Sequence, residues 1–243
     1  MANFSYASRL RASQDILTVL KSIEDYIPLR QEESVEGMDT FIKSLVETNN
    51  SVTNLNKEKK LLVKERRDYF YTGQNSVMNI FTALKANIKY QYGKNSGQIE
   101  LLEEISKRMK SVRAEKAITA APPSEDGTVT QQVTETQVVK QGEKTFASLT
   151  KNFNDYVTTV AAFEGYLPAN ELFKIEKLNE LSEKLHSVNN EIALKLLELR
   201  SMKHQRAEMY DELKDRVRRI KLNIRAKYGA NSSVYKQIRT KIV

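Results

Sequence analysis

The chain has 243 residues, enough to bury a sizeable core, and it carries only 8 glycines, 4 prolines and no tryptophan. The lack of cysteine excludes disulfides, thiolate metal sites and cysteine nucleophiles. The formal net charge is +8, and residues 200–241 alone hold 13 Lys and Arg against 4 Asp and Glu, so the basic character is local.

The N-terminal stretch has charged residues among its apolar positions. Arg9, Arg11 and Asp15 interrupt them, so the stretch lacks the continuous apolar core of a signal peptide. No part of the sequence approaches the ~20 apolar residues of a membrane span. We therefore expect a soluble, cytoplasmic protein without a membrane span.

The first predicted helix covers about residues 7 to 26. Its apolar positions Ile16, Leu20 and Ile23 recur at spacings of four and three, which is the period of one helix face. Pro28 ends the helix in this interpretation, because proline lacks the amide donor and disfavours helix in the residue before it.

A long helix follows in the first half of the chain. Apolar residues step by three, four or seven over residues 41 to 62 and again over residues 77 to 88. Thr72 and Gly73 are predicted to interrupt or kink this helix, since glycine costs about 1 kcal/mol against alanine in a helix interior.

A final helix of the first half starts near Ser96. Its apolar face consists of Ile99, Leu102, Ile105, Met109 and Val112. Residues 119–144 then form a predicted flexible linker, marked by Pro122, Pro123 and Gly127 and by the lack of a helical period. Its β-branched stretch leaves two interpretations open, a mobile tether and a strand that joins another structure.

The second half repeats this pattern. A helix over residues 147 to 166 ends before Pro168, and residues 170 to 228 contain no glycine or proline. Their apolar positions predict one helix of roughly 85 to 90 Å at 1.5 Å per residue. A break at Asn189 and Asn190 is the alternative, but continuity is favoured because the pattern stays in phase across the pair.

The two halves align with each other. An offset of 140 pairs Asp15 with Asp155 and Tyr26 with Tyr166, and further along the chain the offset falls to 136. The collinear match covers roughly 85 residues, and such self-similarity indicates an internal duplication.

One short motif, N-I-basic-x-x-Y-G-x-N-S, occurs in both copies. Its conserved positions are Tyr92, Gly93, Asn95 and Ser96 in the first copy and Tyr228, Gly229, Asn231 and Ser232 in the second. Glycine just past a helix end adopts the left-handed conformation that closes the last turn, and Asn or Ser two to three residues later caps the next helix. We interpret the motif as a structural helix stop, with a duplicated ligand site as the alternative.

The last 20 residues, IRAKYGANSSVYKQIRTKIV, resemble the C-termini of uncharacterised bacterial helical proteins that share a Y-G-x-x-S-x-x-Y pattern before a short basic tail. In the first copy, Gln98 and Ile99 replace the Val and Tyr of this pattern. The resemblance implies a helical fold and nothing catalytic, since no function is attached to that group.

The sequence contains no arrangement typical of a catalytic, metal or cofactor site. His186 and His204 are about five helical turns apart in one helix, and neither has carboxylates at a ligand spacing. We therefore expect no catalytic residue, no metal, no cofactor and no small-molecule ligand.

One charged feature has a defined shape. Basic residues step by four, three and four beside an apolar stripe of the last long helix, and two further basic residues widen this basic stripe. Its members are Lys214, Arg218, Lys221 and Arg225, widened by Arg219 and Lys227. Such a stripe suits nucleic-acid phosphates, anionic lipid or an acidic protein partner. The favoured interpretation is a solvated helix face, partly offset by acidic residues of a facing helix.

We therefore predict an all-α protein, an elongated antiparallel bundle of two duplicated short-helix/long-helix hairpins with pseudo-twofold symmetry. Residues 1–118 form the first repeat and residues 145–243 the second. The expected function is a non-enzymatic structural or scaffolding role through self-association or a protein partner. The alternative is a nucleic-acid-associated protein that uses the basic stripe.

Overall fold

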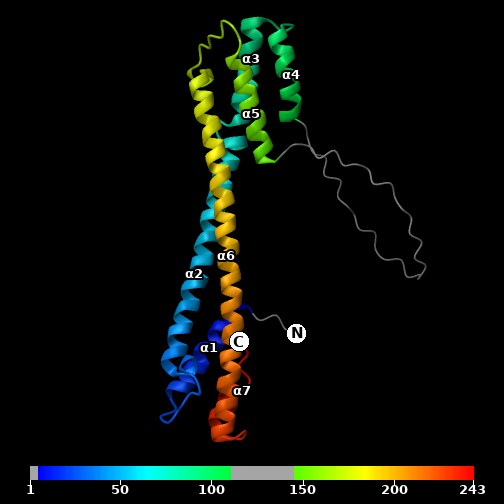
Figure 1. Ribbon diagram of the computed structural model, residues 1–243. Coiled ribbons are helices and arrows are strands. Elements are labelled where there is room, and N and C mark those ends of the chain that lie inside the picture. Colours follow the sequence, from blue (N-terminus) through cyan, green and yellow to red (C-terminus); the bar gives the residue numbers. More distant parts are fainter. Residues whose placement is uncertain (1–4, 111–144) are drawn as a thin grey trace, which may run out of the picture. The chain divides into compact units, whose positions relative to one another are not determined.

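The structure, a computed structural model, describes residues 5–110 and 145–243, and these residues form helices and connections without a strand (Figure 1). The all-α prediction is confirmed. The α-helices are α1 (Tyr6–Lys21), α2 (Val35–Arg67), α3 (Val77–Tyr92), α4 (Gly97–Lys110), α5 (Phe146–Ala161), α6 (Ile175–Tyr228) and α7 (Ser233–Arg239). The short turns are the 3-10 turns η1 (Gln31–Glu33) and η3 (Glu171–Phe173) and the π-helical turn η2 (Asp68–Thr72). The predicted linker, residues 119–144, lies outside the described residues.

The first helix of each half ends earlier than predicted. α1 stops at Lys21 instead of near residue 26, and α5 stops at Ala161 instead of near residue 166. The amide and the hydroxyl of Ser22 both donate to the Val19 carbonyl, at 3.1 and 2.7 Å, so local hydrogen bonds close the last turn of α1. Pro28 lies in the following connection and does not end the helix.

The two long helices differ in continuity. α6 continues through Asn189 and Asn190, as the phase of its apolar positions predicts. The corresponding helix of the first half is interrupted at the predicted place, because η2 follows α2 and Gly73 begins the connection to α3. A Cβ atom at Gly73 would lie 2.9 Å from the Asp68 carbonyl oxygen, so this close approach of two backbone segments requires glycine.

The chain divides into two compact units. The terminal unit contains residues 1–62 and 192–243, and the internal unit contains residues 63–191. Each unit therefore takes residues from both predicted repeats. α2 and α6 contribute residues to both units, because each helix continues across the division.

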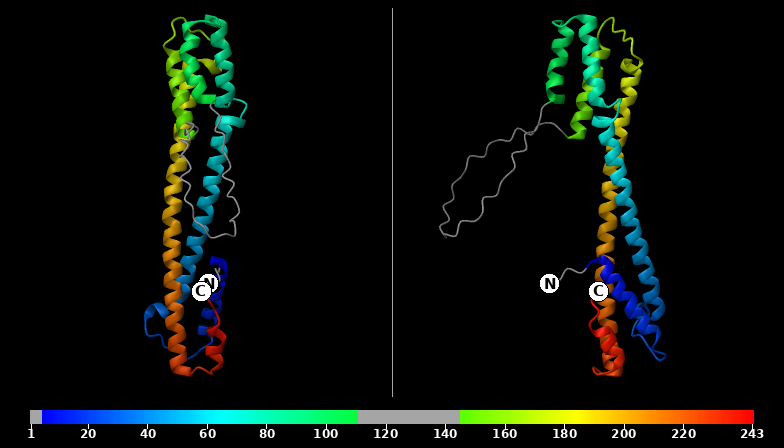
Figure 2. Two further views of the ribbon diagram at one scale, coloured as in Figure 1. Left: turned by 90° about the vertical axis from the view of Figure 1, so that its right-hand side faces the viewer. Right: turned by 180° about the vertical axis from the view of Figure 1, so that it is seen from behind.

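The core of the terminal unit joins α1, the first part of α2, the second part of α6 and α7. Helix α7 packs against α1 (Figure 2). The buried residues of this core include Ile16, Leu20, Met38, Leu45, Tyr210, Leu213, Ile220, Ile224 and Ile238. Their spacing along each helix places one apolar face of that helix inward, which accounts for the helical arrangement.

Within the terminal unit, α2 and α6 also pair in a stretch where Val52, Leu55 and Leu199 are buried. The Asn49 amide donates to the Tyr210 hydroxyl at 2.9 Å. The Lys195 ammonium and the Glu58 carboxylate lie 2.8 Å apart. In these contacts residue numbers rise on α2 as they fall on α6.

The core of the internal unit joins α3, α4, α5 and the first part of α6. Its buried residues include Phe81, Leu84, Ile88, Leu102, Phe153, Tyr156, Val160, Leu178 and Leu185. The rings of Phe81 and Tyr156 meet edge to face with their centroids 4.8 Å apart. This geometry is the favourable one for buried aromatic pairs.

Two contacts of the terminal unit recur in the internal unit at a sequence offset of 140. In each unit a tyrosine hydroxyl donates to the last carbonyl of a 3-10 turn, and an arginine lies over an aromatic ring. These contacts are Tyr26 to the Glu33 carbonyl (3.0 Å) and Tyr166 to the Phe173 carbonyl (2.7 Å), then Arg206 over Tyr6 (4.3 Å) and Arg66 over Phe146 (3.9 Å). The offset therefore pairs equivalent interactions as well as equivalent residues.

Candidate interaction surfaces

The two helix-stop motifs follow the ends of α3 and α6. Gly93 and Gly229 have φ angles of 91° and 88°, in the left-handed region that glycine adopts at little cost. Each glycine amide bonds to the carbonyl four residues earlier at 3.0 Å. The hydroxyls of Ser96 and Ser232 each accept the amide three residues later, at 3.4 and 3.2 Å. These contacts close one helix and begin the next.

The other residues of the motifs lie at the surface or hold a neighbouring connection. The Tyr92 hydroxyl donates to the Glu164 carbonyl at 3.0 Å in the internal unit. In the terminal unit, the Tyr228 hydroxyl donates to the Asp25 carboxylate at 2.7 Å. Their asparagines, Asn95 and Asn231, are exposed. Each tyrosine thus ties a helix end to the connection that follows α5 or α1.

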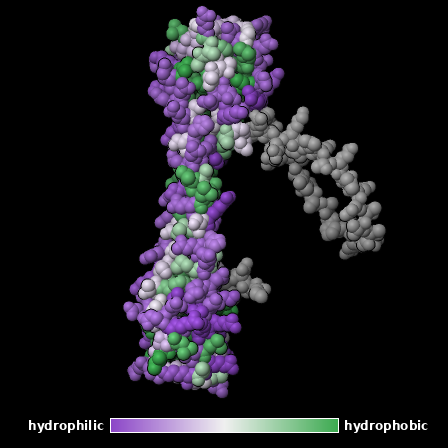
Figure 3. Space-filling view, in the orientation of Figure 1, coloured by the Kyte–Doolittle hydropathy of each residue, from purple (hydrophilic) through white to green (hydrophobic). Residues whose placement is uncertain are grey.

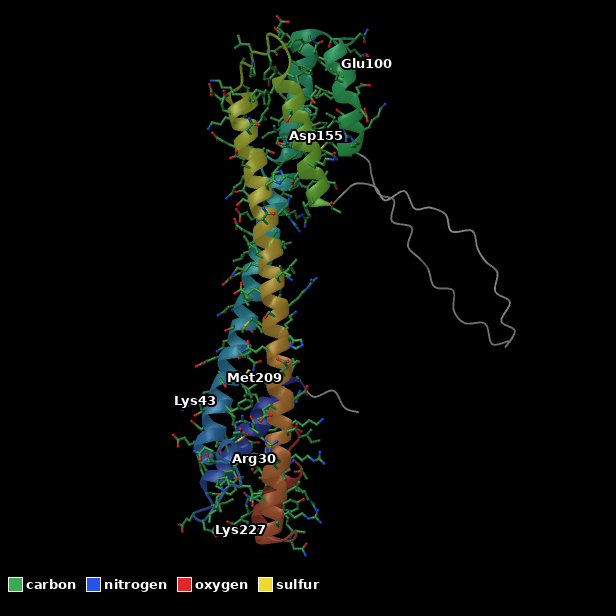
Figure 4. All side chains as sticks on the ribbon, in the orientation of Figure 1. Arg30, Lys43, Glu100, Asp155, Met209 and Lys227 are labelled. Carbon is green, nitrogen blue, oxygen red and sulfur yellow. The ribbon has the colours of Figure 1, made fainter. Side chains whose placement is uncertain are left out.

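Two of the six predicted basic residues contact carboxylates from the connection between α1 and α2. The Arg219 guanidinium donates to the buried Glu33 carboxylate, and this hydrogen bond raises the pKa of Arg219. Lys227 lies in the last turn of α6 (Figure 4). Its ammonium is 3.0 Å from the Asp25 carboxylate. Hydrogen bonding to Asp25 raises the pKa of Lys227. Sequence reasoning anticipated such acidic neighbours only in general terms.

A third predicted residue, Lys221, is half-buried. Its ammonium donates to the carbonyl of Arg239, the last residue of α7, at 3.3 Å, and to the carbonyl of Lys241 just beyond that helix. Burial lowers the pKa of Lys221. Lys221 therefore fastens the end of α7 to α6.

The remaining three, Lys214, Arg218 and Arg225, form what we call the basic face. All three are exposed, and among the described residues no carboxylate lies within 4.0 Å of their charged nitrogens. Asp211 and Asp215 are exposed on the same stretch of α6, three residues before Lys214 and Arg218. The basic face thus keeps three cations free for an anionic partner.

A cavity of about 370 Å³ lies beside the basic face. Its lining combines cationic side chains with apolar ones, namely Lys214, Val217, Arg218, Lys221, Leu222, Tyr235, Lys241, Ile242 and Val243. Lys241 is already paired with the Asp15 carboxylate at 2.6 Å. Lys214 and Arg218 are therefore the cations of this cavity that have no partner among the described residues.

A second surface was not predicted. On the paired stretch of α2 and α6, Leu61, Leu194 and Leu197 are 67%, 65% and 60% exposed, and we call them the leucine face. Figure 3 shows hydrophobic surface over this stretch. The sequence does contain a signal, because these leucines fall outside the steps of three and four that mark the buried positions.

Within the part of the chain that the structure describes, no helix is long and apolar enough to cross a membrane, and no three His, Asp or Glu side chains are grouped as metal ligands would be. No protein-family model, no curated protein and no solved structure matched the chain.

Proposed function

We propose that the protein is a non-enzymatic scaffold that acts by helix association through the leucine face, with a second copy or another protein as partner. The observation that carries this proposal is the exposure of Leu61, Leu194 and Leu197 on helices whose other side is already paired. Clustered exposed apolar side chains mark interaction sites. Full burial of one leucine side chain contributes about 1.5–3 kcal/mol of favourable free energy. A partner that covers the leucine face would bury these side chains and so be stabilised in the complex.

The architecture that we propose for this scaffold is a pair of antiparallel short-helix/long-helix hairpins that arose by duplication and are related by a pseudo-twofold axis. The recurrence of the tyrosine and arginine contacts at an offset of 140 supports it. The contacts of Asn49 with Tyr210 and of Glu58 with Lys195 support an antiparallel pair of long helices.

Site-specific photo-cross-linking in the native host tests the proposed function. A photoreactive residue at Leu194 should give a protein adduct, because this position belongs to the leucine face. The matched control is Lys203, an exposed residue of the same helix. An adduct at Lys203 but none at Leu194, or no adduct at either position, would contradict the scaffold function.

A second candidate function is nucleic-acid binding, and the free cations of the basic face favour it. Phosphate contacts give a linear loss of log affinity with log salt, with a slope of about −0.9 per contact on duplex DNA. The double variant Lys214→Gln/Arg218→Gln should therefore lower the slope by about two units. The control Arg200→Gln/Lys203→Gln removes two exposed cations from the same helix and should leave the slope unchanged. Equal losses from both variants would exclude a specific role for the basic face.

A further inference from the structure

We propose that the leucine face binds the leucine face of a second copy of this chain, with α2 of each copy lying antiparallel to α6 of the other. This inference rests on the proposed scaffold function and names its partner. Three features of α2 and α6 lead to it: the charges that flank the leucines, the spacing of those charges, and the level at which the leucines lie.

The leucines are flanked by opposite charges on the two helices. On α2, Leu61 lies between Lys57 and Lys64, and all three side chains are exposed. The two lysines form no ion pair within 4.0 Å among the described residues. They are therefore free to meet carboxylates of a partner.

On α6, two glutamates flank the corresponding leucine. Leu194 lies between Glu191 and Glu198, and all three are exposed. One oxygen of Glu198 lies 3.1 Å from the Lys195 ammonium, and one oxygen of Glu191 accepts from the Ser187 hydroxyl at 2.9 Å. The second oxygen of each carboxylate is free for a lysine of another copy.

The spacings of the two triplets match only in one direction. The steps along α2 are four and then three, whereas those along α6 are three and then four. When the two helices run in opposite directions with Leu61 against Leu194, Lys57 lies level with Glu198 and Lys64 lies level with Glu191. If the helices ran parallel with the two leucines aligned, each lysine would be displaced by one residue from the level of the nearest glutamate. Complementary charges fix such a register.

Both contacts form at once in a symmetric dimer. Within one chain, Glu58 pairs with Lys195, which places Leu61 and Leu194 at nearly the same level of the α2–α6 pair. In heptad notation, the buried residues Val52 and Leu55 take positions a and d of α2, and the buried residues Ile192 and Leu199 take position a of α6. Leu61 and Leu194 then both fall at position c of their helices. In an antiparallel pair the c positions of both helices lie on the same side. A twofold axis parallel to the helices then brings each Leu61 onto the Leu194 of the other copy, as an isologous interface requires.

The decisive test is a charge exchange followed by sedimentation velocity of the full chain at low ionic strength, where exposed charges act most strongly. The variants Lys57→Glu/Lys64→Glu and Glu191→Lys/Glu198→Lys should each weaken the dimer about tenfold or more. The quadruple variant should dimerise to within about threefold of the original chain, because every contact is restored with its charges inverted. In Lys57→Glu/Lys64→Glu the charges flanking both leucines are acidic, and in Glu191→Lys/Glu198→Lys they are all basic. An equimolar mixture of these two variants should therefore form a heterodimer, because their opposite charges attract.

A matched control keeps this result specific. Arg200→Glu/Lys203→Glu also reverses two exposed cations of α6, at heptad positions on the opposite side, and should leave the dimer unchanged. Circular dichroism of every variant shows whether the helices persist, which matters because Glu198 also bonds to Lys195 of its own chain. A dimer that both double variants leave intact would overturn the proposed contact, as would equal weakening by the control.

Failure of this inference is distinguishable from failure of the scaffold function. If the purified chain stays monomeric and the cross-link at Leu194 captures a different protein, the second copy is excluded and the scaffold function stands. If the cross-link at Leu194 yields no adduct in the host, both are overturned. An adduct of twice the mass of the chain at Leu194, lost in Lys57→Glu/Lys64→Glu, is the result expected here.

Discussion

The terminal and internal units place equivalent helices around their cores, yet their charges differ. The terminal unit contains 22 Lys and Arg against 14 Asp and Glu, whereas the internal unit contains 17 of each. The whole net charge of +8 therefore belongs to the terminal unit. The two units thus share two contacts at an offset of 140 but differ in net charge.

The difference extends into the core at the end of the 3-10 turns. Glu33 is 1% exposed and accepts a hydrogen bond from Arg219, while its counterpart at an offset of 140 is Phe173, which is 8% exposed. The counterpart of Arg219 at an offset of 136 is Ala83. A buried carboxylate needs a cationic partner, whereas a buried phenyl ring needs only close packing. The same position is thus stabilised by charge in one unit and by hydrophobic burial in the other.

Exchanging this chemistry should have the largest effect in the internal unit. Phe173→Glu removes a buried ring and buries a carboxylate beside a helix that carries Ala83 in place of an arginine, so we expect a loss of about 4 kcal/mol or more. Adding Ala83→Arg should recover part of that loss. Urea unfolding measures the total loss of unfolding free energy. Faster amide hydrogen exchange at Leu84 and Phe153 would show that the loss lies in the internal unit. A loss below about 1 kcal/mol would show that Phe173 is not a core residue in solution.

Removing the cation should be the next largest effect. Arg219→Ala leaves Glu33 buried without its partner, and breaking a buried pair costs 3–5 kcal/mol in general; we expect about 3 kcal/mol, because Arg219 is 29% exposed. The double variant Glu33→Met/Arg219→Met should be much closer to the original stability, since an apolar pair needs no counter-charge. Urea unfolding of all three chains measures both values. Equal losses of unfolding free energy in the single and double variants would show that the unpaired carboxylate of Glu33 is not the cause of the destabilisation.

The sequence predicted those features that depend on residues close together in the chain. The continuity of α6 followed from apolar positions that keep phase across Asn189 and Asn190, and the interruption after α2 followed from Gly73. α1 ends earlier than its sequence predicts, because the hydroxyl of Ser22 closes the last turn and Pro28 lies in the connection beyond it. Local hydrogen bonds therefore end α1 at a residue that precedes Pro28.

The candidate surfaces were predicted less completely, because their chemistry depends on distant residues. Arg219 bonds to a glutamate 186 residues earlier in the chain, so no local pattern distinguishes it from Arg218, which stays free. The leucine face was missed for another reason. Periodicity identifies buried positions, and Leu61 and Leu194 lie outside the apolar stripes that it marks.

Acid should affect the terminal unit more than the internal unit. Among the described residues, the aspartates with a lowered pKa are Asp15, Asp25 and Asp39, all in the terminal unit, and the main cause in each is a hydrogen bond, from Lys241, Tyr228 and Lys43 respectively. A carboxyl whose pKa is lower in the folded than in the unfolded chain stabilises the fold above its ordinary value of 3.8 and loses that effect as the pH falls further. Carboxyl ¹³C titration by NMR should place all three midpoints below 3.8. Midpoints at or above this value would remove the expected difference between the units.

The smallest effect should be one that the two units share. Tyr26→Phe and Tyr166→Phe each delete a hydroxyl that donates to a backbone carbonyl, so each should cost about 1 kcal/mol in urea unfolding. Burial raises the pKa of both phenols to about 12, so absorbance titration of the original chain should show neither ionising near pH 10. The acceptor is a main-chain carbonyl in both units, so the change from Glu33 to Phe173 should leave the two costs alike. If Tyr26→Phe costs 1 kcal/mol more than Tyr166→Phe, the side-chain difference between the units reaches this hydrogen bond as well.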